Sequence, residues 1–199
     1  SLQHGPLSKT WELASYEGDA QDVTFYLDAS PYSLAGILVL DGWPVQYFAS
    51  PLSHHDDTIH RKKLGDSSGQ QVWESLAALV ALTVWFPFWS DRRCCFTIKS
   101  DNTSALTLAG SLKSNKSLGL IAKEVSLLYC RAQYEPKFLS HIPGVTNVAA
   151  DALSRLNDPA HAYAVPPWLH ECNCKEVKVP LRTTACYKTL GSAKPSQVG

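Results

Sequence analysis

Four acidic residues lie in places that favour chemistry over simple solvation: Asp28, Glu74, Asp101 and Asp151. Asp28 and Asp101 each follow a run of apolar and β-branched residues that is typical of a strand. Glu74 is the single charged residue in the 18-residue stretch 72–89. A carboxylate buried without a partner is costly, so Glu74 is expected to serve a function.

The secondary structure expected around these acids would bring them together. Parallel strands of an α/β sheet end at one common edge, so Asp28 and Asp101 should lie there. Glu74, near the start of a helix, and Asp151, inside a later helix, can reach the same edge. Four carboxylates in one place repel one another unless divalent cations bind among them. The sequence therefore predicts a cation site at this edge.

The elements that position the acids follow one another as three strands, a helix, a strand, two helices, a strand and a helix. The first strands, at 23–28, 36–40 and 43–49, form an antiparallel meander, because Asp41-Gly42 is a strong hairpin signal. Pro44 assigns the third strand to a sheet edge. The later elements are expected at 70–86, 94–99, 103–109, 117–133, 136–142 and 147–156. We predict an α/β fold with a mixed five-stranded sheet, three strands antiparallel and two parallel, and helices on both faces.

Length and composition indicate one globular domain with extensions. The chain has 199 residues, 45% of them hydrophobic, which supports one core. We expect a linker from a preceding region at 1–20, the domain at 21–156 and a tail or linker at 157–199. Basic and acidic residues both number 18, so no overall basic field attracts a polyanion. Binding of nucleic acid must therefore be local or supplied by a partner.

Cysteine usage and hydropathy bear on the compartment. Cys94, Cys95 and Cys130 lie in apolar segments, which favours an intracellular chain over a secreted disulfide framework. The chain holds no Met and opens with no targeting pattern, so we interpret it as a piece of a longer product. A membrane span at 72–89 is an alternative, but a helix packed inside an α/β domain is equally apolar and is favoured here.

Four segments carry a resemblance to a known family: 27–30, 70–74, 100–102 and 141–155. The last is the most specific, because it runs from His-Ile-Pro-Gly to Ala-Asp-Ala-Leu-Ser-Arg. Together they resemble the ribonuclease H domain of retrotransposon reverse transcriptases, either long-terminal-repeat (gypsy-like) or tyrosine-recombinase (DIRS-like). The resemblance covers about 22–156 and implies the ribonuclease H-like fold.

The resemblance also implies an activity and its residues. It implies hydrolysis of the RNA strand of an RNA/DNA hybrid with two Mg²⁺ ions, for which Mn²⁺ can substitute. Metal-binding catalytic acids would be Asp28, Glu74, Asp101 and Asp151. His141 matches the family's mobile histidine. Substrate contacts are expected from Ser30, Gln70, Gln71 and Asn102, with the two glutamines recognising sugar 2′-hydroxyls.

The implied partners are the hybrid and an adjacent reverse transcriptase polymerase domain, with no membrane. The family context places the chain in a cytoplasmic or nuclear retroelement particle, not in a secreted protein. The link at 111–116 offers only Lys113 and Lys116, where cellular relatives often carry a long basic loop. We therefore expect the isolated chain to bind hybrid weakly.

Other interpretations stay open. A catalytically inactive copy, kept as a spacer or binding module beside a polymerase, is the main alternative. An integrase or transposase on the same fold would use fewer acids and lack the His-Ile-Pro-Gly block. In the tail, zinc binding is conceivable at His170, Cys172, Cys174 and Cys186. Their spacing is poor for a zinc finger, so a flexible linker is favoured.

Overall fold

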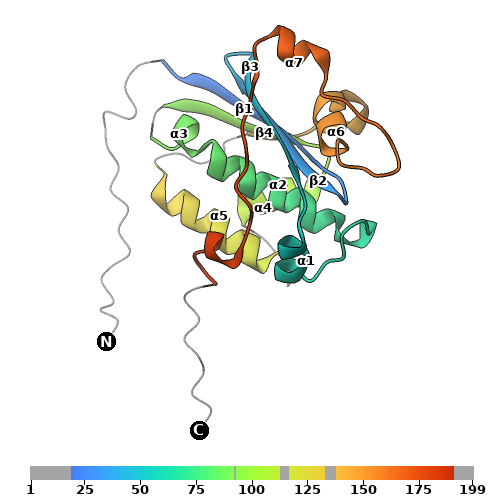
Figure 1. The fold of residues 1–199 in the computed structure, drawn as a ribbon. Coiled ribbons are helices and arrows are strands. Elements are labelled where there is room, and N and C mark those ends of the chain that lie inside the picture. The colour runs from blue at the N-terminus through green and yellow to red at the C-terminus, as the bar shows by residue number, and fades with distance from the viewer. Residues whose placement is uncertain (1–18, 92, 113–116, 133–137, 191–199) are drawn as a thin grey trace, which may run out of the picture.

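A computed structural model describes residues 19–91, 93–112, 117–132 and 138–190. Its centre is a mixed sheet of six strands in the order β5-β4-β1-β2-β3-β6 (Figure 1). The strands are β1 (Gln21–Ala29), β2 (Ser33–Leu40), β3 (Trp43–Pro51), β4 (Cys94–Ser100), β5 (Phe138–His141) and β6 (Lys175–Glu176). The predicted α/β fold is confirmed, and β6 is an addition from the segment expected to be a tail.

Strand pairing follows the predicted pattern. β1, β2 and β3 form the antiparallel meander, and β4 and β5 continue the sheet in parallel from β1. The β2–β3 turn has positive φ at Asp41 and Gly42, as an Asp-Gly hairpin turn requires. β3 would be an edge strand as Pro44 predicts, but its Gln46 and Tyr47 pair with β6. The tail segment therefore covers part of that edge.

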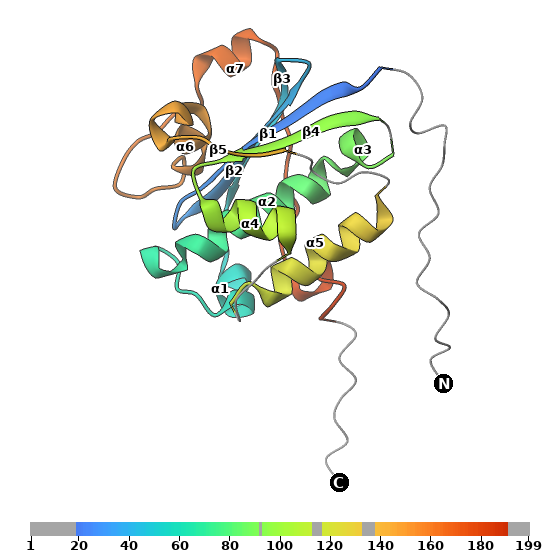
Figure 2. The ribbon, with the colours of Figure 1, turned by 180° about the vertical axis from the view of Figure 1, so that it is seen from behind.

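Three helices cover one face of the sheet: α2 (Gln70–Val84), α4 (Thr103–Ser111) and α5 (Gly119–Arg131) (Figure 2). α2 is the central one, and every residue from Val72 to Leu82 is buried. This explains its uniform hydrophobicity, because the sheet, α4 and α5 all contact it. Among the residues described, no helix has the length and hydropathy to cross a membrane.

The opposite face carries a smaller core beneath α6 (Val148–Ser154) and α7 (Pro167–Glu171). Ala35, Ile37 and Tyr47 of the sheet pack there with Leu153 and Leu169 of the two helices. Helices therefore lie on both faces, as predicted. Because α6 contacts β1 and β2, it brings its polar residues close to the end of β1.

Residues 50–69 are mostly polar, which predicts a solvated loop between the strand and the helix on either side, but the segment is partly helical. They form helix α1 (His54–His60) and a 3-10 turn (Ser67–Gly69). Ser53 and Asp56 make a reciprocal capping box at the start of α1, and Arg61 ends it in the left-handed conformation. Asp56 and His60 are buried, so this polar segment includes part of the packed structure.

The segment after Asn157 contacts the domain at several points, the last of them at Thr189. Arg182 is 6% exposed and makes a buried ion pair with Asp56, with Nε 2.8 Å from Oδ1. Tyr187 Oη lies 2.9 Å from Nε2 of His60, and Thr189 N donates to Glu124 at 2.7 Å. The boundaries 21–156 stay a prediction, but the described part of the following segment belongs to the folded structure. We call residues 174–190 the C-terminal strap.

Two helix ends also differ from expectation. The helix predicted at 70–86 ends at Val84, and Pro87 lies in the first turn of a short following helix, α3 (Phe86–Trp89). The helix predicted at 103–109 extends to Ser111, so Gly110 lies inside α4. Neither difference moves an acidic residue.

Candidate active site

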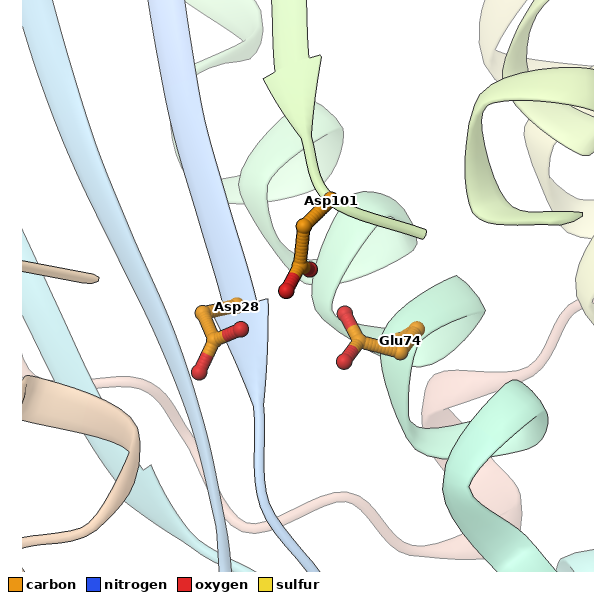
Figure 3. A group of neighbouring side chains, drawn as sticks. All are labelled: Asp28, Glu74 and Asp101. Atoms are coloured by element: carbon orange, nitrogen blue, oxygen red, sulfur yellow. The ribbon is translucent and has the colours of Figure 1, made fainter. Parts of the chain in front are cut away.

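Asp28 and Asp101 come together through the register of two parallel strands. Tyr26 of β1 pairs with Lys99 of β4, and each acid lies two residues further along its chain. Their side chains therefore emerge at the same edge of the sheet, as the sequence predicted. Figure 3 shows them converging there.

Glu74 completes the group from α2, whose second turn passes under this edge (Figure 3). One carboxylate oxygen from each of Asp28, Glu74 and Asp101 lies within 4.8 Å of the others. Asp28 is 6% exposed and Glu74 3% exposed, whereas Asp101 is open to solvent. The group is thus buried on one side and accessible on the other.

The hydrogen bonds of Glu74 leave one oxygen without a partner. Gln70 Nε2 donates to Glu74 Oε1 at 2.7 Å and to the carbonyl oxygen of Ala29 at 2.5 Å. Glu74 Oε2 is fully buried and has no hydrogen-bond partner among the described residues. A buried carboxylate oxygen without a donor is rare and points to a missing ligand. Hard divalent cations prefer carboxylate oxygens, so the group fits Mg²⁺ or Mn²⁺.

The same crowding shifts the carboxyl groups towards protonation when no cation is bound. Burial is the main cause that raises the pKa of Asp28 to about 7, the hydrogen bond from Ser154 opposes this shift, and the charges of Asp101 and Asp151 add to it. Burial and the charge of Asp28 raise the pKa of Glu74 well above its ordinary value. Bound positive charge would reverse both shifts.

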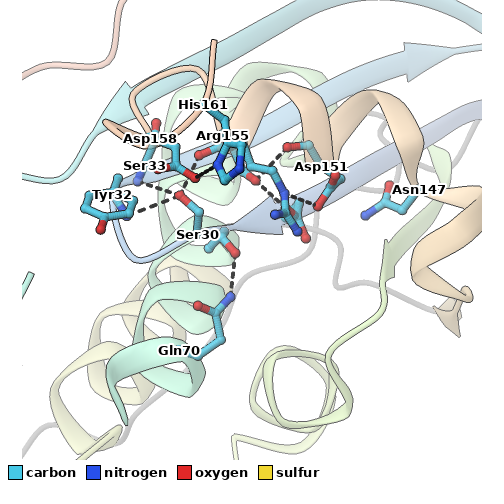
Figure 4. Close-up of polar contacts among 12 residues, drawn as sticks. Ser30, Tyr32, Ser33, Gln70, Asn147, Asp151, Arg155, Asp158 and His161 are labelled. Carbon is cyan, nitrogen blue, oxygen red and sulfur yellow. Dashed lines mark hydrogen bonds and ion pairs between the residues drawn. The ribbon is translucent and has the colours of Figure 1, made fainter. Parts of the chain in front are cut away.

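Asp151 and His141 lie beside the three acids but outside their group. Asp151 is 40% exposed, and its Oδ1 accepts a hydrogen bond from Arg155 Nε at 2.7 Å (Figure 4). Asp151 is close enough for its charge to raise the pKa of Asp28. His141 is exposed, and its Nε2 lies 3.0 Å from the carbonyl oxygen of Asp101. A carbonyl oxygen only accepts, so Nε2 carries the proton in this contact.

The expected substrate contacts occupy different settings. Gln71 is exposed, one residue beyond Gln70 on the first turn of α2. Asn102 Oδ1 accepts from Ala105 N at 3.1 Å and so caps α4. Ser30 is buried, donates to the carbonyl oxygen of Ser154 at 2.6 Å and accepts from Tyr32 N and Ser33 N. These contacts fix Ser30 in the turn after β1, away from solvent.

Several residues around the acids were not singled out from the sequence. Ser154 Oγ donates to Asp28 Oδ2 at 2.5 Å, and Asn147 Nδ2 donates to the carbonyl oxygen of Leu27 at 2.9 Å. A side chain on Gly144 would come within 3.0 Å of Asp101 Oδ2, so glycine leaves room for that carboxylate. All three residues belong to the block 141–155. The resemblance of that block to a known family is the sequence signal that could have identified them.

The cysteines of the tail do not form a comparable group. In the described part of the chain, His170, Cys172, Cys174 and Cys186 belong to no cluster of three or more close potential ligands. Burial and the neighbouring Cys172 raise the pKa of the Cys174 thiol to about 11, so this thiol is protonated at neutral pH when no metal is bound. The zinc interpretation therefore gains no support.

A solved structure shares this architecture. Ribonuclease H1 from the halophilic archaeon Halobacterium salinarum NRC-1 superimposes with a TM-score of 0.50 and 19% identity, over 70% of this chain and 99% of that one. The fold is that of ribonuclease H1. A metagenomic enzyme from compost, LC11-RNase H1, aligns over 72% of this chain and 99% of its own, with 15% identity and a TM-score of 0.44. No family model and no curated protein matches the sequence.

Proposed function

We propose that this chain is a metal-dependent nuclease that hydrolyses the RNA strand of RNA/DNA hybrids. The observation that carries the proposal is the group of three carboxylates at the strand edge of a ribonuclease H fold, with one buried oxygen unpartnered. Such a group is unfavourable by itself and becomes favourable around a divalent cation. The protein thus maintains a site whose negative charge a divalent cation can offset.

Asp28, Glu74 and Asp101 would hold the cation, with Oε2 of Glu74 as the ligand that no donor engages. A cation bound there supplies Lewis-acid charge at a phosphodiester and lowers the pKa of a water molecule. The buried side of the group excludes water, while the exposed Asp101 faces the direction from which a substrate can approach. Binding of two ions, which the resemblance implies, would also require the Asp151 carboxylate as a ligand. Asp151 would then have to leave its ion pair with Arg155.

The residues next to the acids would bind and orient the hybrid. Gln71 and the amide oxygen of Gln70 would meet the sugar 2′-hydroxyls of the RNA strand, which distinguish RNA from DNA. Asn102 borders the group and would contact the backbone near the cleaved phosphate. Ser30 would act indirectly, because its hydrogen bonds hold the turn after Asp28 in place. His141 would move protons or assist product departure beside Asp101.

The block 141–155 also motivates a biological setting. We propose that the chain is part of a retroelement reverse transcriptase, working beside a polymerase domain in a cytoplasmic or nuclear particle. The polymerase would supply the affinity for hybrid that a chain with zero net charge lacks.

A panel of duplexes tests the substrate class. The full chain is incubated with Mg²⁺ or Mn²⁺ and a labelled RNA/DNA hybrid, a double-stranded RNA or a double-stranded DNA. We expect fragments of the RNA strand of the hybrid and intact homoduplexes. Intact hybrid under every cation condition, with hybrid still bound, would favour the inactive binding module instead.

A further inference from the structure

Ser154, the last residue of α6, is fully buried beside the acidic group. Its Oγ lies 2.5 Å from Asp28 Oδ2 and 2.9 Å from the carbonyl oxygen of Asp151. A hydroxyl has one proton to donate, and a carboxylate is a stronger acceptor than a carbonyl. The Ser154 hydroxyl therefore donates its hydrogen bond to Asp28, and not to the carbonyl oxygen, whenever the Asp28 carboxyl group is ionised.

This contact resembles the one that Gln70 makes with Glu74. In both, a neutral donor engages one oxygen of a buried carboxylate: Oδ2 in Asp28 and Oε1 in Glu74. The other oxygen of each is left for a further partner, and in Glu74 that oxygen is buried and unpartnered. A neutral donor fixes the orientation of a carboxylate without adding a positive charge that would compete with a cation.

We propose that Ser154 is a positioning residue that aims the Asp28 carboxylate at a divalent cation. The inference rests on the proposed function, since it concerns the same site. It assigns a role to a residue that the family's four acids do not include.

Docking of α6 does not depend on the Ser154 hydroxyl. The backbone carbonyl of Ser154 accepts from Ser30 Oγ at 2.6 Å, and Asn147 Nδ2 donates to the carbonyl oxygen of Leu27 at 2.9 Å. Neither contact uses the Ser154 side chain, so both should persist when that side chain is replaced. The hydroxyl is therefore available for Asp28 rather than needed for packing.

The test measures Mn²⁺ binding of the full chain through the rise in melting temperature with Mn²⁺ concentration. We expect Ser154→Ala to raise the half-saturating Mn²⁺ concentration about tenfold or more, because loss of a partner behind a metal ligand has effects of this size. Ser154→Cys, with similar volume and a weaker donor, should lie between alanine and wild type. It also serves if the alanine variant fails to fold. Ser75→Ala is the matched control, because Ser75 is a fully buried helix serine whose Oγ donates to the carbonyl oxygen of Gln71.

A double-mutant cycle with Asp28→Asn separates positioning from general stabilisation. If Ser154 acts through Asp28, Ser154→Ala should not weaken Mn²⁺ binding further in the Asp28→Asn background. An unchanged half-saturating concentration in Ser154→Ala, or an equal added loss in both backgrounds, would overturn the inference. Wild type that binds Mn²⁺ with the expected Ser154 effect but cuts no hybrid would refute the proposed function alone.

Discussion

Asp28 and Glu74 combine burial with negative charge, and this conflict dominates the site at the scale of single residues. Both carboxyl groups have a raised pKa, chiefly because burial disfavours the ionised form. The folded, metal-free chain therefore retains protons that the unfolded chain has lost near neutral pH. Cation binding and proton binding must compete at these groups.

This competition predicts a pH effect on stability. The folded-state pKa of Asp28 is about 7, against an ordinary value of 3.8. The stability that the folded chain gains from binding this proton more tightly than the unfolded chain is therefore fully present below about pH 4. It is lost as the pH rises through 7. In a chelator, Asp28→Asn should therefore be more stable than wild type at pH 8, by roughly 2–4 kcal/mol, since one pKa unit corresponds to about 1.4 kcal/mol. Denaturant unfolding from pH 4 to pH 8 measures the difference. A gap between the two proteins that does not grow with pH would contradict the raised pKa.

Gln71→Ala tests the expected contact with the RNA strand. Because Gln71 is exposed and one lost hydrogen bond weakens binding by about 1 kcal/mol, we expect roughly fivefold slower hybrid cleavage with unchanged Mn²⁺ binding. Gln70→Ala should weaken both hybrid cleavage and Mn²⁺ binding, since Gln70 also donates to Glu74.

A hybrid with one deoxynucleotide at the contacted position provides the control for Gln71. Wild type should cut it poorly, and Gln71→Ala should cut it no worse than the all-ribose strand. Equal sensitivity of the two proteins to the deoxy substitution would place the recognition of RNA elsewhere.

At the scale of elements, the C-terminal strap joins parts of the sequence that are far apart. Arg182 contacts Asp56 twice, at 2.8 and 3.0 Å, and donates to Ser50 Oγ at 2.7 Å. Asp56 also accepts from Ser53 at the start of α1. One buried ion pair thus links the strap to α1 and to the end of β3.

Arg182→Met should destabilise the fold by about 3–5 kcal/mol, because it leaves the fully buried Asp56 without its cation. The free energy of unfolding in urea measures the loss. His54→Ala is the comparison, since the His54–Asp57 pair is solvent-exposed and should contribute less than about 1 kcal/mol. Similar small effects of both changes would show that the strap is not part of the stable core.

The elements that sequence predicted well are those with a clear hydrophobic period. The meander, α2 and the strands before Asp28 and Asp101 follow from alternation, the Asp-Gly turn and helical spacing. Asp56 and His60 were hidden in a polar stretch, because their burial depends on Arg182 and Tyr187 more than 120 residues later. β6 pairs only two residues and has no period of its own.

Site prediction met the same limit. Placing three acids at one edge needs only strand direction and the position of one helix, so sequence order was enough. The pairing of Asp151 with Arg155 and the contact of Ser154 with Asp28 depend on side-chain geometry within and between elements. The order of residue types in the sequence does not determine which of these contacts form.

On the scale of the whole molecule, charge balance limits how tightly the chain can bind a polyanion. The net charge is zero, and Lys113 and Lys116, the basic residues expected in the link before α5, lie outside the described residues. We expect the isolated chain to bind hybrid weakly at physiological salt, and a fused polymerase domain to restore affinity. Fluorescence anisotropy of a labelled hybrid across a salt series measures the affinity of the isolated chain and of the fused protein. Tight binding by the isolated chain with a steep salt dependence would contradict this expectation.

The most direct test of the central claim compares wild type with Asp101→Asn on a hybrid whose two strands carry different labels. Asp101→Asn removes a charge from the acidic group without removing volume, and Asp91→Asn, at an exposed position outside the group, is the matched control. We predict that wild type and Asp91→Asn cut the RNA strand only when Mg²⁺ or Mn²⁺ is present, leaving 5′-phosphate and 3′-hydroxyl ends. Asp101→Asn should cut at least about a hundredfold more slowly, because a metal ligand is lost, while its melting temperature in a chelator should be no lower than that of wild type. Cleavage by Asp101→Asn at the wild-type rate, or cleavage that persists in a chelator, would contradict the account.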